Sequence, residues 1–163
     1  MLILGCGNTD RADDAAGILV ARRLRELGID AREHVADMVA LIDEWRGEDE
    51  VILIDAVIMG ATPGTITSWD ACKAALPPER FACSTHAVGV AEVVELARAI
   101  NQLPPKLVVY GIEGSNFEPG GALSPGVVAA VERLAQNIAC HHTNQNLFVT
   151  VVSAVSGSPG GTK

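Results

Sequence analysis

Hydrophobic residues follow two different patterns along this chain. Short continuous apolar runs end at a glycine or a polar residue, as in strands that are buried on both faces. These runs occupy residues 1–5, 51–57 and 106–112. Longer runs carry apolar residues three and four positions apart, which indicates amphipathic helices. These occupy residues 14–28, 88–100 and 124–139.

Weaker patterns fill the intervals between these runs. They predict a polar strand at 29–36, near an edge of a sheet, and a short helix at 38–46. They also predict a turn followed by a strand within 60–69 and a brief helical turn within 70–80 that a proline pair stops. Because strands alternate with helices, we predict an α/β fold of three layers. Its mostly parallel twisted sheet has about five strands, with helices on both faces.

The pattern changes near residue 140. Residues 1–140 predict a single α/β domain, and residues 141–163 predict a C-terminal tail that is partly flexible. The tail begins with a polar stretch, continues with an apolar run at 147–155 and ends in serine, glycine and proline. The apolar run is compatible with an edge strand or with a poorly ordered segment.

Composition limits the class of protein. The chain has 163 residues, of which 48% are hydrophobic and only 4% aromatic, so aliphatic side chains must fill the core of about one domain. Its formal net charge is −8, which disfavours nonspecific binding to nucleic acid. No basic N-terminal segment precedes an apolar run and no run reaches transmembrane length, so we expect no membrane association and a cytoplasmic protein.

The four cysteines do not form a recognisable motif. Cys6, Cys72, Cys83 and Cys140 lack the C-x-x-C spacing of a metal or redox site. In the cytoplasm we expect them to be reduced and to behave as small buried hydrophobic residues.

Three polar residues stand where the predicted topology places a site. In open α/β sheets, sites form beyond the carboxyl ends of the strands. Asp14 follows the first strand at the start of the first helix, Asp55 ends the clearest strand, and His86 precedes the second strong helix. Each also has a structural interpretation: a helix start for Asp14, a turn cap for Asp55, and capping or packing for His86. Their joint placement favours a site.

The chemistry of this set points to a divalent metal. Two carboxylates and one imidazole suit nickel, zinc or cobalt, and three protein ligands leave coordination positions open. A dinucleotide site is disfavoured, because Asp10 stands where the fingerprint needs glycine and two further aspartates would repel a pyrophosphate. Cys83, Ser84 and Thr85 lie beside His86, but adjacent residues point in different directions, so a nucleophile there is also disfavoured.

Three segments resemble the hydrogenase maturation proteases. They are LGCGNTDRADDAAG at residues 4–17, LIDAVIMGATPGTI at 53–66 and STHAVGVAEVV at 84–94. The resemblance covers about residues 1–140, with the three segments in order. It implies a soluble, monomeric cytoplasmic endopeptidase that removes the C-terminal extension of the nickel–iron hydrogenase large-subunit precursor after nickel insertion.

The resemblance also implies which residues act. Asp14, Asp55 and His86 match the family's metal-contacting and catalytic set. Nickel would be carried by the precursor and sensed by this set, although other divalent metals can occupy such a site. Whether the metal also polarises the scissile carbonyl or a carboxylate acts as general base stays open.

Several positions depart from the family pattern. Residues 36–39 read Ala-Asp-Met-Val where the family often has an Asp-Gly-Gly-like turn, although Asp37 can still line the cleft. Glu113 and Glu118 lie in a stretch where we expect a solvated loop rather than substrate contacts. His141 and His142 beside Cys140 resemble a metal site only superficially, since neighbours in sequence rarely bind one ion.

Two other functions compete with the protease. A nickel-dependent docking or chaperone module would bind the precursor without cutting it, and the lack of a visible nucleophile favours it. A nucleotide-dependent enzyme on a similar scaffold would have to bind a phosphate beside the carboxylates of the first loop.

Overall fold

A five-stranded sheet forms the centre of the molecule. A computed structural model describes residues 1–35, 37–81 and 89–155. The strands run in the order β2-β1-β3-β5-β4, and β4 alone is antiparallel to its neighbour. Their bounds are β1 Leu2–Cys6, β2 Arg32–His34, β3 Glu50–Val57, β4 Ile66–Asp70 and β5 Lys106–Glu113. The predicted strands and the edge position of β2 are confirmed.

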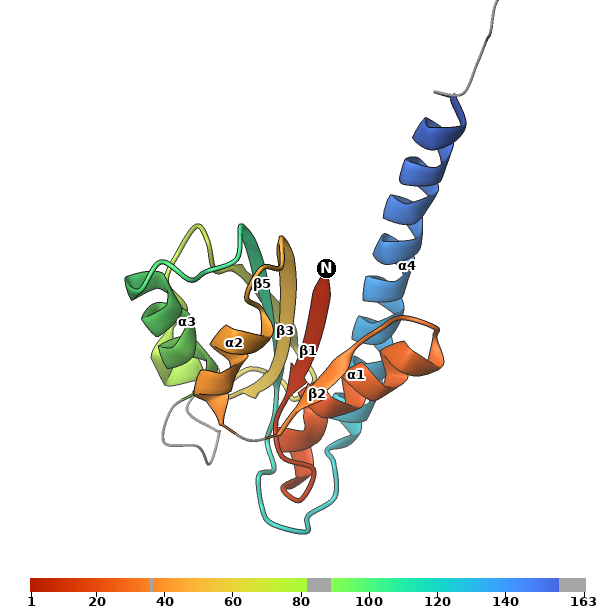
Figure 1. Cartoon of the computed structure of the whole chain (residues 1–163). Coiled ribbons are helices and arrows are strands. Elements are labelled where there is room, and N and C mark those ends of the chain that lie inside the picture. Colours follow the sequence, from red (N-terminus) through yellow and green to blue (C-terminus); the bar gives the residue numbers. More distant parts are fainter. Residues whose placement is uncertain (36, 82–88, 156–163) are drawn as a thin grey trace, which may run out of the picture.

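Helices cover both faces of this sheet. The helices are η1 Ala12–Ala15, α1 Ala16–Glu26, η2 Met38–Ala40, α2 Leu41–Glu44, η3 Pro78–Arg80, α3 Val90–Ala99 and α4 Pro125–Val155. Figure 1 shows α1 and α4 on one side of the sheet and α2 and α3 on the other. The predicted three-layer α/β fold is therefore confirmed.

The continuous apolar run of β3 is explained by burial on both faces. Val51, Leu53 and Val57 pack with α2 and α3 in one core cluster. Ile52 and Ile54 pack with α1 and α4 in the other. Because side chains alternate between the two faces of a strand, a strand that lies between two helical layers needs apolar residues at successive positions. The one charged residue in the middle of this run, Asp55, is thereby placed in the interior.

The structure corrects three expectations outside the site. α4 continues to Val155, through the polar stretch where a break was expected, so the run at 147–155 is helical rather than an edge strand. The predicted helical turn follows Asp70 and ends before the proline pair, but Pro78 then begins a further helix, η3, which was not expected. Cys140 is exposed, whereas Cys6 is buried as expected. Cys83 lies outside the described residues.

No helix in the described part of the chain is both long enough and apolar enough to span a membrane.

Candidate functional site

Three neighbouring strands place polar side chains in one row near their carboxyl ends. Cys6 of β1 is in register with His34 of β2, and Asp55 of β3 is in register with Gly111 of β5. Gly5 of β1 is in register with Ile54 of β3, so the next residues of these strands, Cys6 and Asp55, are neighbours as well. Residues in register point to the same face of a sheet. The row therefore brings His34, Cys6 and Asp55 together beneath the loops that follow the strands.

The glycine loop after β1 carries Asp14 to this edge. Gly7 has a φ of +138°, and a Cβ atom there would lie 1.9 Å from the carbonyl oxygen of Asp14. Only glycine permits both the turn and this close approach. The loop is closed by the N–H of Asn8, which donates to the Asp14 carbonyl at 3.2 Å. Gly7 thus allows the chain to fold a carboxylate back over the end of β1.

Asp14 is buried in η1, at the start of the first helix. Its side chain is 2% exposed, and Oδ2 lies 3.7 Å from Nη1 of Arg11. η1 packs against β3, close enough for the charge of Asp14 to raise the pKa of Asp55. The structure therefore brings together two of the three residues that the sequence singled out.

Asp55 is a buried carboxyl group of which only one oxygen is hydrogen-bonded to a described residue. It is 1% exposed, and its Oδ1 accepts a hydrogen bond from the N–H of Ala56 at 2.9 Å. Its Oδ2 is buried and accepts no hydrogen bond from any described residue. Burial, and secondly the charge of Asp14, raise the pKa of Asp55 to about 8. A cation between the two carboxylates would relieve both effects, so the pair fits a divalent metal.

Asp13, the neighbour of Asp14, has a structural task. Its carboxylate accepts hydrogen bonds from the N–H groups of Ser115, Asn116 and Ser124 and from the Ser124 hydroxyl, at 2.7–2.9 Å. Burial alone would raise the pKa of Asp13, but these hydrogen bonds outweigh it and hold the pKa below its usual value. Asp13 thus fixes the loop between β5 and α4. Ser124 directly precedes α4, and its hydroxyl donates to Asp13.

Glu113 organises the loop that follows β3. It is 2% exposed, so the expectation of a solvated position is wrong for this residue, while Glu118 is exposed as expected. The carboxylate of Glu113 accepts hydrogen bonds from the N–H groups of Met59, Gly60 and Ala61 at 2.8–3.2 Å. Sequence reasoning missed this role, because the partners lie more than fifty positions away. Its place as the last residue of an apolar strand was the available signal.

His34 was also missed, and it fixes the segment after β2. Its Nδ1 lies 2.6 Å from Oε1 of Glu44, and its Nε2 donates to the carbonyl of Asp37 at 2.9 Å. Asp37 itself accepts a hydrogen bond from the N–H of Val39 at 3.0 Å and is exposed beside the row. It is therefore held at the rim of the edge where the sequence placed it.

His86, with Cys83, Ser84 and Thr85, lies outside the described residues. Its part in the set stays a prediction. Within residues 1–35, 37–81 and 89–155, no group of three or more histidine, cysteine, aspartate or glutamate side chains is arranged to hold a metal.

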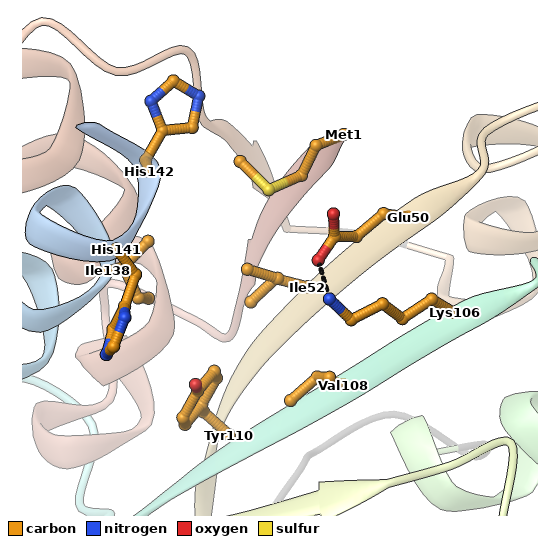
Figure 2. A pocket seen from close by; sticks show the side chains of 9 residues that line it. All are labelled: Met1, Glu50, Ile52, Lys106, Val108, Tyr110, Ile138, His141 and His142. Atoms are coloured by element: carbon orange, nitrogen blue, oxygen red, sulfur yellow. Dashed lines mark hydrogen bonds and ion pairs between the residues drawn. The ribbon is translucent and has the colours of Figure 1, made fainter. Parts of the chain in front are cut away.

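The histidine pair of α4 belongs to the opposite end of the sheet. His141 and His142 line a cavity of about 270 Å³ together with the Lys106–Glu50 ion pair (Figure 2). Glu50 begins β3 and Asp55 lies five residues further on, which is roughly 16 Å along an extended strand. This pair therefore takes no part in the site at the carboxyl edge.

Comparison with known proteins agrees with the resemblance. The sequence profile described as "HycI: Hydrogenase maturation protease" matches residues 26–141. The chain is 27% identical over 150 residues to the Hydrogenase 2 maturation protease of Escherichia coli, covering 85% of this chain and 87% of that protein. It is 28% identical over 152 residues to a putative hydrogenase maturation protease of Methanocaldococcus jannaschii, covering 85% of this chain and 93% of that protein.

Solved structures show the same relationship. The [NiFe] hydrogenase maturation protease HybD from Thermococcus kodakarensis superposes with a TM-score of 0.65 at 26% identity, covering 84% of this chain and 95% of that one. The HycI protease from the same organism superposes with a TM-score of 0.63 at 29% identity, covering 85% and 88%. The chain therefore belongs to the hydrogenase maturation protease family, a family of peptide-bond hydrolases.

Proposed function

We propose that this protein is an endopeptidase that removes the C-terminal extension of a nickel–iron hydrogenase large-subunit precursor after nickel has been inserted. Membership of the hydrogenase maturation protease family supports the protease activity and the class of substrate. The observation that carries the nickel dependence is the buried carboxylate pair of Asp14 and Asp55. Burial and the nearby charge of Asp14 raise the pKa of Asp55, so the ionised form of Asp55 is unfavourable there unless a cation is bound.

The cation in this proposal is the nickel of the precursor, so it is part of the substrate. Asp14 and Asp55 offer carboxylate oxygens, and His86 is the proposed nitrogen ligand. Such a mixed oxygen and nitrogen set suits nickel, and it leaves positions for ligands from the precursor. Only a nickel-loaded precursor would then gain this contact, which orders insertion before cleavage.

The reaction itself is the addition of water across one peptide bond. The bond between the carbonyl carbon and the amide nitrogen breaks, the hydroxyl goes to the carbonyl carbon, and the proton goes to the leaving amine. Without a metal the pKa of Asp55 is about 8, and binding of its carboxylate to the nickel of the precursor would release that proton.

The test is mass spectrometry of a purified precursor incubated with this protein, with and without nickel in the precursor. We expect loss of a C-terminal peptide from the nickel-loaded precursor alone. Asp14→Asn and His86→Ala should lower the rate at least a hundredfold. Asp10→Asn is the matched control, since Asp10 is an exposed acid of the same loop, and it should cleave at the wild-type rate.

Two results would contradict the proposal. Equal cleavage of nickel-free precursor would show that the protein does not sense nickel. Full activity of Asp14→Asn would show that Asp14 is not part of the site. If the nickel-loaded precursor binds in a pull-down but is not cut, the protein is instead the non-cleaving docking module. A binding assay with nickel alone, comparing wild type with Asp14→Asn, reports on the metal set independently of activity.

A further inference from the structure

The outer edge of β4 carries unused backbone hydrogen-bonding groups near the candidate site. β4 ends the strand order, and no described strand pairs with its outer side. Thr65 accepts from the N–H of Glu113, and the N–H of Ala71 donates to a carbonyl of β5. Odd-numbered residues of β4 therefore face β5. Since alternate residues of an antiparallel strand direct their backbone groups to opposite sides, Ile66 and Ser68 present theirs outward.

A groove of about 500 Å³ adjoins this edge on the sheet face that carries Asp55. Its walls include loop 59–61 and Thr67 and Trp69 of β4. Thr67 is in register with Gly111, and Gly111 with Asp55, so the groove lies two strand spacings, about 10 Å, from Asp55.

The walls of this groove are fixed by packing and hydrogen bonds. Buried Glu113 holds the backbone of loop 59–61. The ring of Trp69 contacts Phe81, with centroids 5.3 Å apart. Its edge also occupies the space that a side chain at Gly111 would fill, because a Cβ there would lie 2.8 Å from the ring. A ligand would therefore meet a preformed surface, which lowers the entropy cost of binding.

Arg80 gives the groove its charge. It is the one charged residue among those that line the groove, and it makes no ion pair with any described residue. Its carbonyl accepts a hydrogen bond from the N–H of Ile58 at 2.9 Å, which ties η3 to the end of β3. An unpaired guanidinium in a groove, on a chain of net charge −8, selects a carboxylate partner.

We propose that the outer edge of β4 binds the C-terminal segment of the hydrogenase precursor as an added strand, with an acidic side chain of that segment facing Arg80. This inference rests on the proposed function. Backbone hydrogen bonds to Ile66 and Ser68 supply affinity, and the groove supplies selectivity, as in other cases of strand addition. An added strand lies about 14 Å from Asp55, which four or five extended residues span. The acidic side chain is expected that far from the scissile bond.

The first test compares two substitutions at Ser68 with the nickel-loaded precursor as substrate. Ser68→Pro removes the outward N–H, and an edge strand tolerates proline at such a position. Ser68→Ala removes the same hydroxyl and keeps the N–H, so it is the matched control. We expect Ser68→Pro to raise KM at least tenfold with kcat within twofold of wild type, and Ser68→Ala to behave as wild type. Circular dichroism and thermal unfolding establish that both variants are folded.

The second test addresses the charge. Arg80→Ala should raise KM several-fold, and Arg80→Lys should raise it less. The difference in KM between wild type and Arg80→Ala should become smaller as salt is added. Arg32→Ala is the control, because Arg32 is an exposed arginine on β2 at the opposite edge of the sheet. Arg80→Glu should cleave better when the acidic residues four or five positions from the cut are replaced by lysine.

Wild-type KM in both Ser68→Pro and Arg80→Ala would overturn this inference while leaving the proposed function intact. Loss of self-association in Ser68→Pro with unchanged KM, measured by sedimentation, would assign the edge to a second copy of this chain and also overturn it. Absence of cleavage by the wild type would refute the proposed function instead. In that case, calorimetric binding of the same precursor decides: weaker binding to Ser68→Pro than to Ser68→Ala supports the edge, and equal or no binding overturns it.

Discussion

At the scale of single residues, environment separates acids that look alike in the sequence. Asp10, Asp13 and Asp14 stand within five positions of one another. Asp10 is exposed, Asp13 is buried with its carboxylate fully hydrogen-bonded, and Asp14 is buried where its charge reaches Asp55. A buried carboxylate that accepts several N–H donors is stabilised as the anion, whereas one beside a like charge is destabilised. The same residue type therefore serves structure at one position and the proposed chemistry at the next.

The raised pKa of Asp55 predicts how stability depends on pH. In the folded protein the carboxyl keeps its proton up to about pH 8, whereas in the unfolded chain it loses it near its usual value. Between these two values the folded state binds the extra proton, so the free energy of unfolding falls as pH rises. Asn at position 55 does not titrate. The stability of Asp55→Asn relative to wild type should therefore grow from pH 4 to pH 8, by at most about 1.4 kcal/mol per pH unit, and level off above.

Urea unfolding of the metal-free protein at several pH values measures this difference. Asp10→Asn is the control, because it makes the same substitution at an exposed acid of the loop after β1. A constant difference between Asp55→Asn and wild type across this range would show that the Asp55 carboxyl titrates normally in the folded protein.

At the scale of elements, buried carboxylates fix the loops that surround the site. Asp13 holds the loop between β5 and α4, and Glu113 holds the loop between β3 and β4. Each belongs to one element and reaches backbone N–H groups of another. Loops gain a defined shape in this way without a hydrophobic core of their own. The β5–α4 loop and the β3–β4 loop, which both lie near the candidate site, are thus held in place by contacts between segments that are distant in the sequence.

Glu113→Gln tests this arrangement. The glutamine NH₂ group replaces one acceptor oxygen and faces either the N–H of Met59 alone or the N–H groups of Met59, Gly60 and Ala61, so at least one hydrogen bond is replaced by a contact between two donors. We expect a loss of about 1–3 kcal/mol in the free energy of unfolding. Amide hydrogen exchange should become faster at residues 59–61 and stay unchanged in β1. Glu118→Gln is the matched control at an exposed glutamate of the following loop, and equal effects of the two substitutions would contradict the role of Glu113.

At the scale of the whole molecule, α4 has two parts with different surroundings. Val127, Ala130 and Leu134 are buried against α1 and the sheet, and the buried α4 residues that the structure describes end with Ile138. Figure 1 shows the later turns of α4 extending past the amino-terminal ends of the strands. The fold therefore depends on the first part of the helix.

Removal of residues 143–163 tests this division. We expect the shortened protein to show the circular dichroism spectrum of a folded α/β domain. Its unfolding temperature should lie within a few degrees of that of the full chain. Leu134→Ala should instead cost about 2–5 kcal/mol in the free energy of unfolding, because it opens a cavity in the core. A shortened protein that fails to fold would show that the later turns of α4 support the domain.

The layers of this fold, and the proximity of two residues of the candidate site, could be predicted from the sequence. A continuous apolar run such as 51–57 indicates a strand buried on both faces, and helical spacing such as that of 14–28 indicates a helix buried on one face. Both patterns are local, so they can be recognised in the sequence. The same pattern made Asp14 and Asp55 conspicuous, since each interrupts or ends an apolar segment. Their placement together followed from the rule that sites form at the carboxyl ends of strands.

Tertiary structure alone decided what lies around these two residues. The partners of Asp13, Glu113 and His34 come from segments that no short pattern connects, so neither their burial nor their hydrogen bonds could be read from the sequence. The same holds for the pKa of Asp55, which depends on burial and on a charge forty-one positions away. The free edge of β4 follows from strand order. Hydrophobic periodicity specifies which faces are buried, whereas the pairing of loops and edges depends on the arrangement of the whole chain.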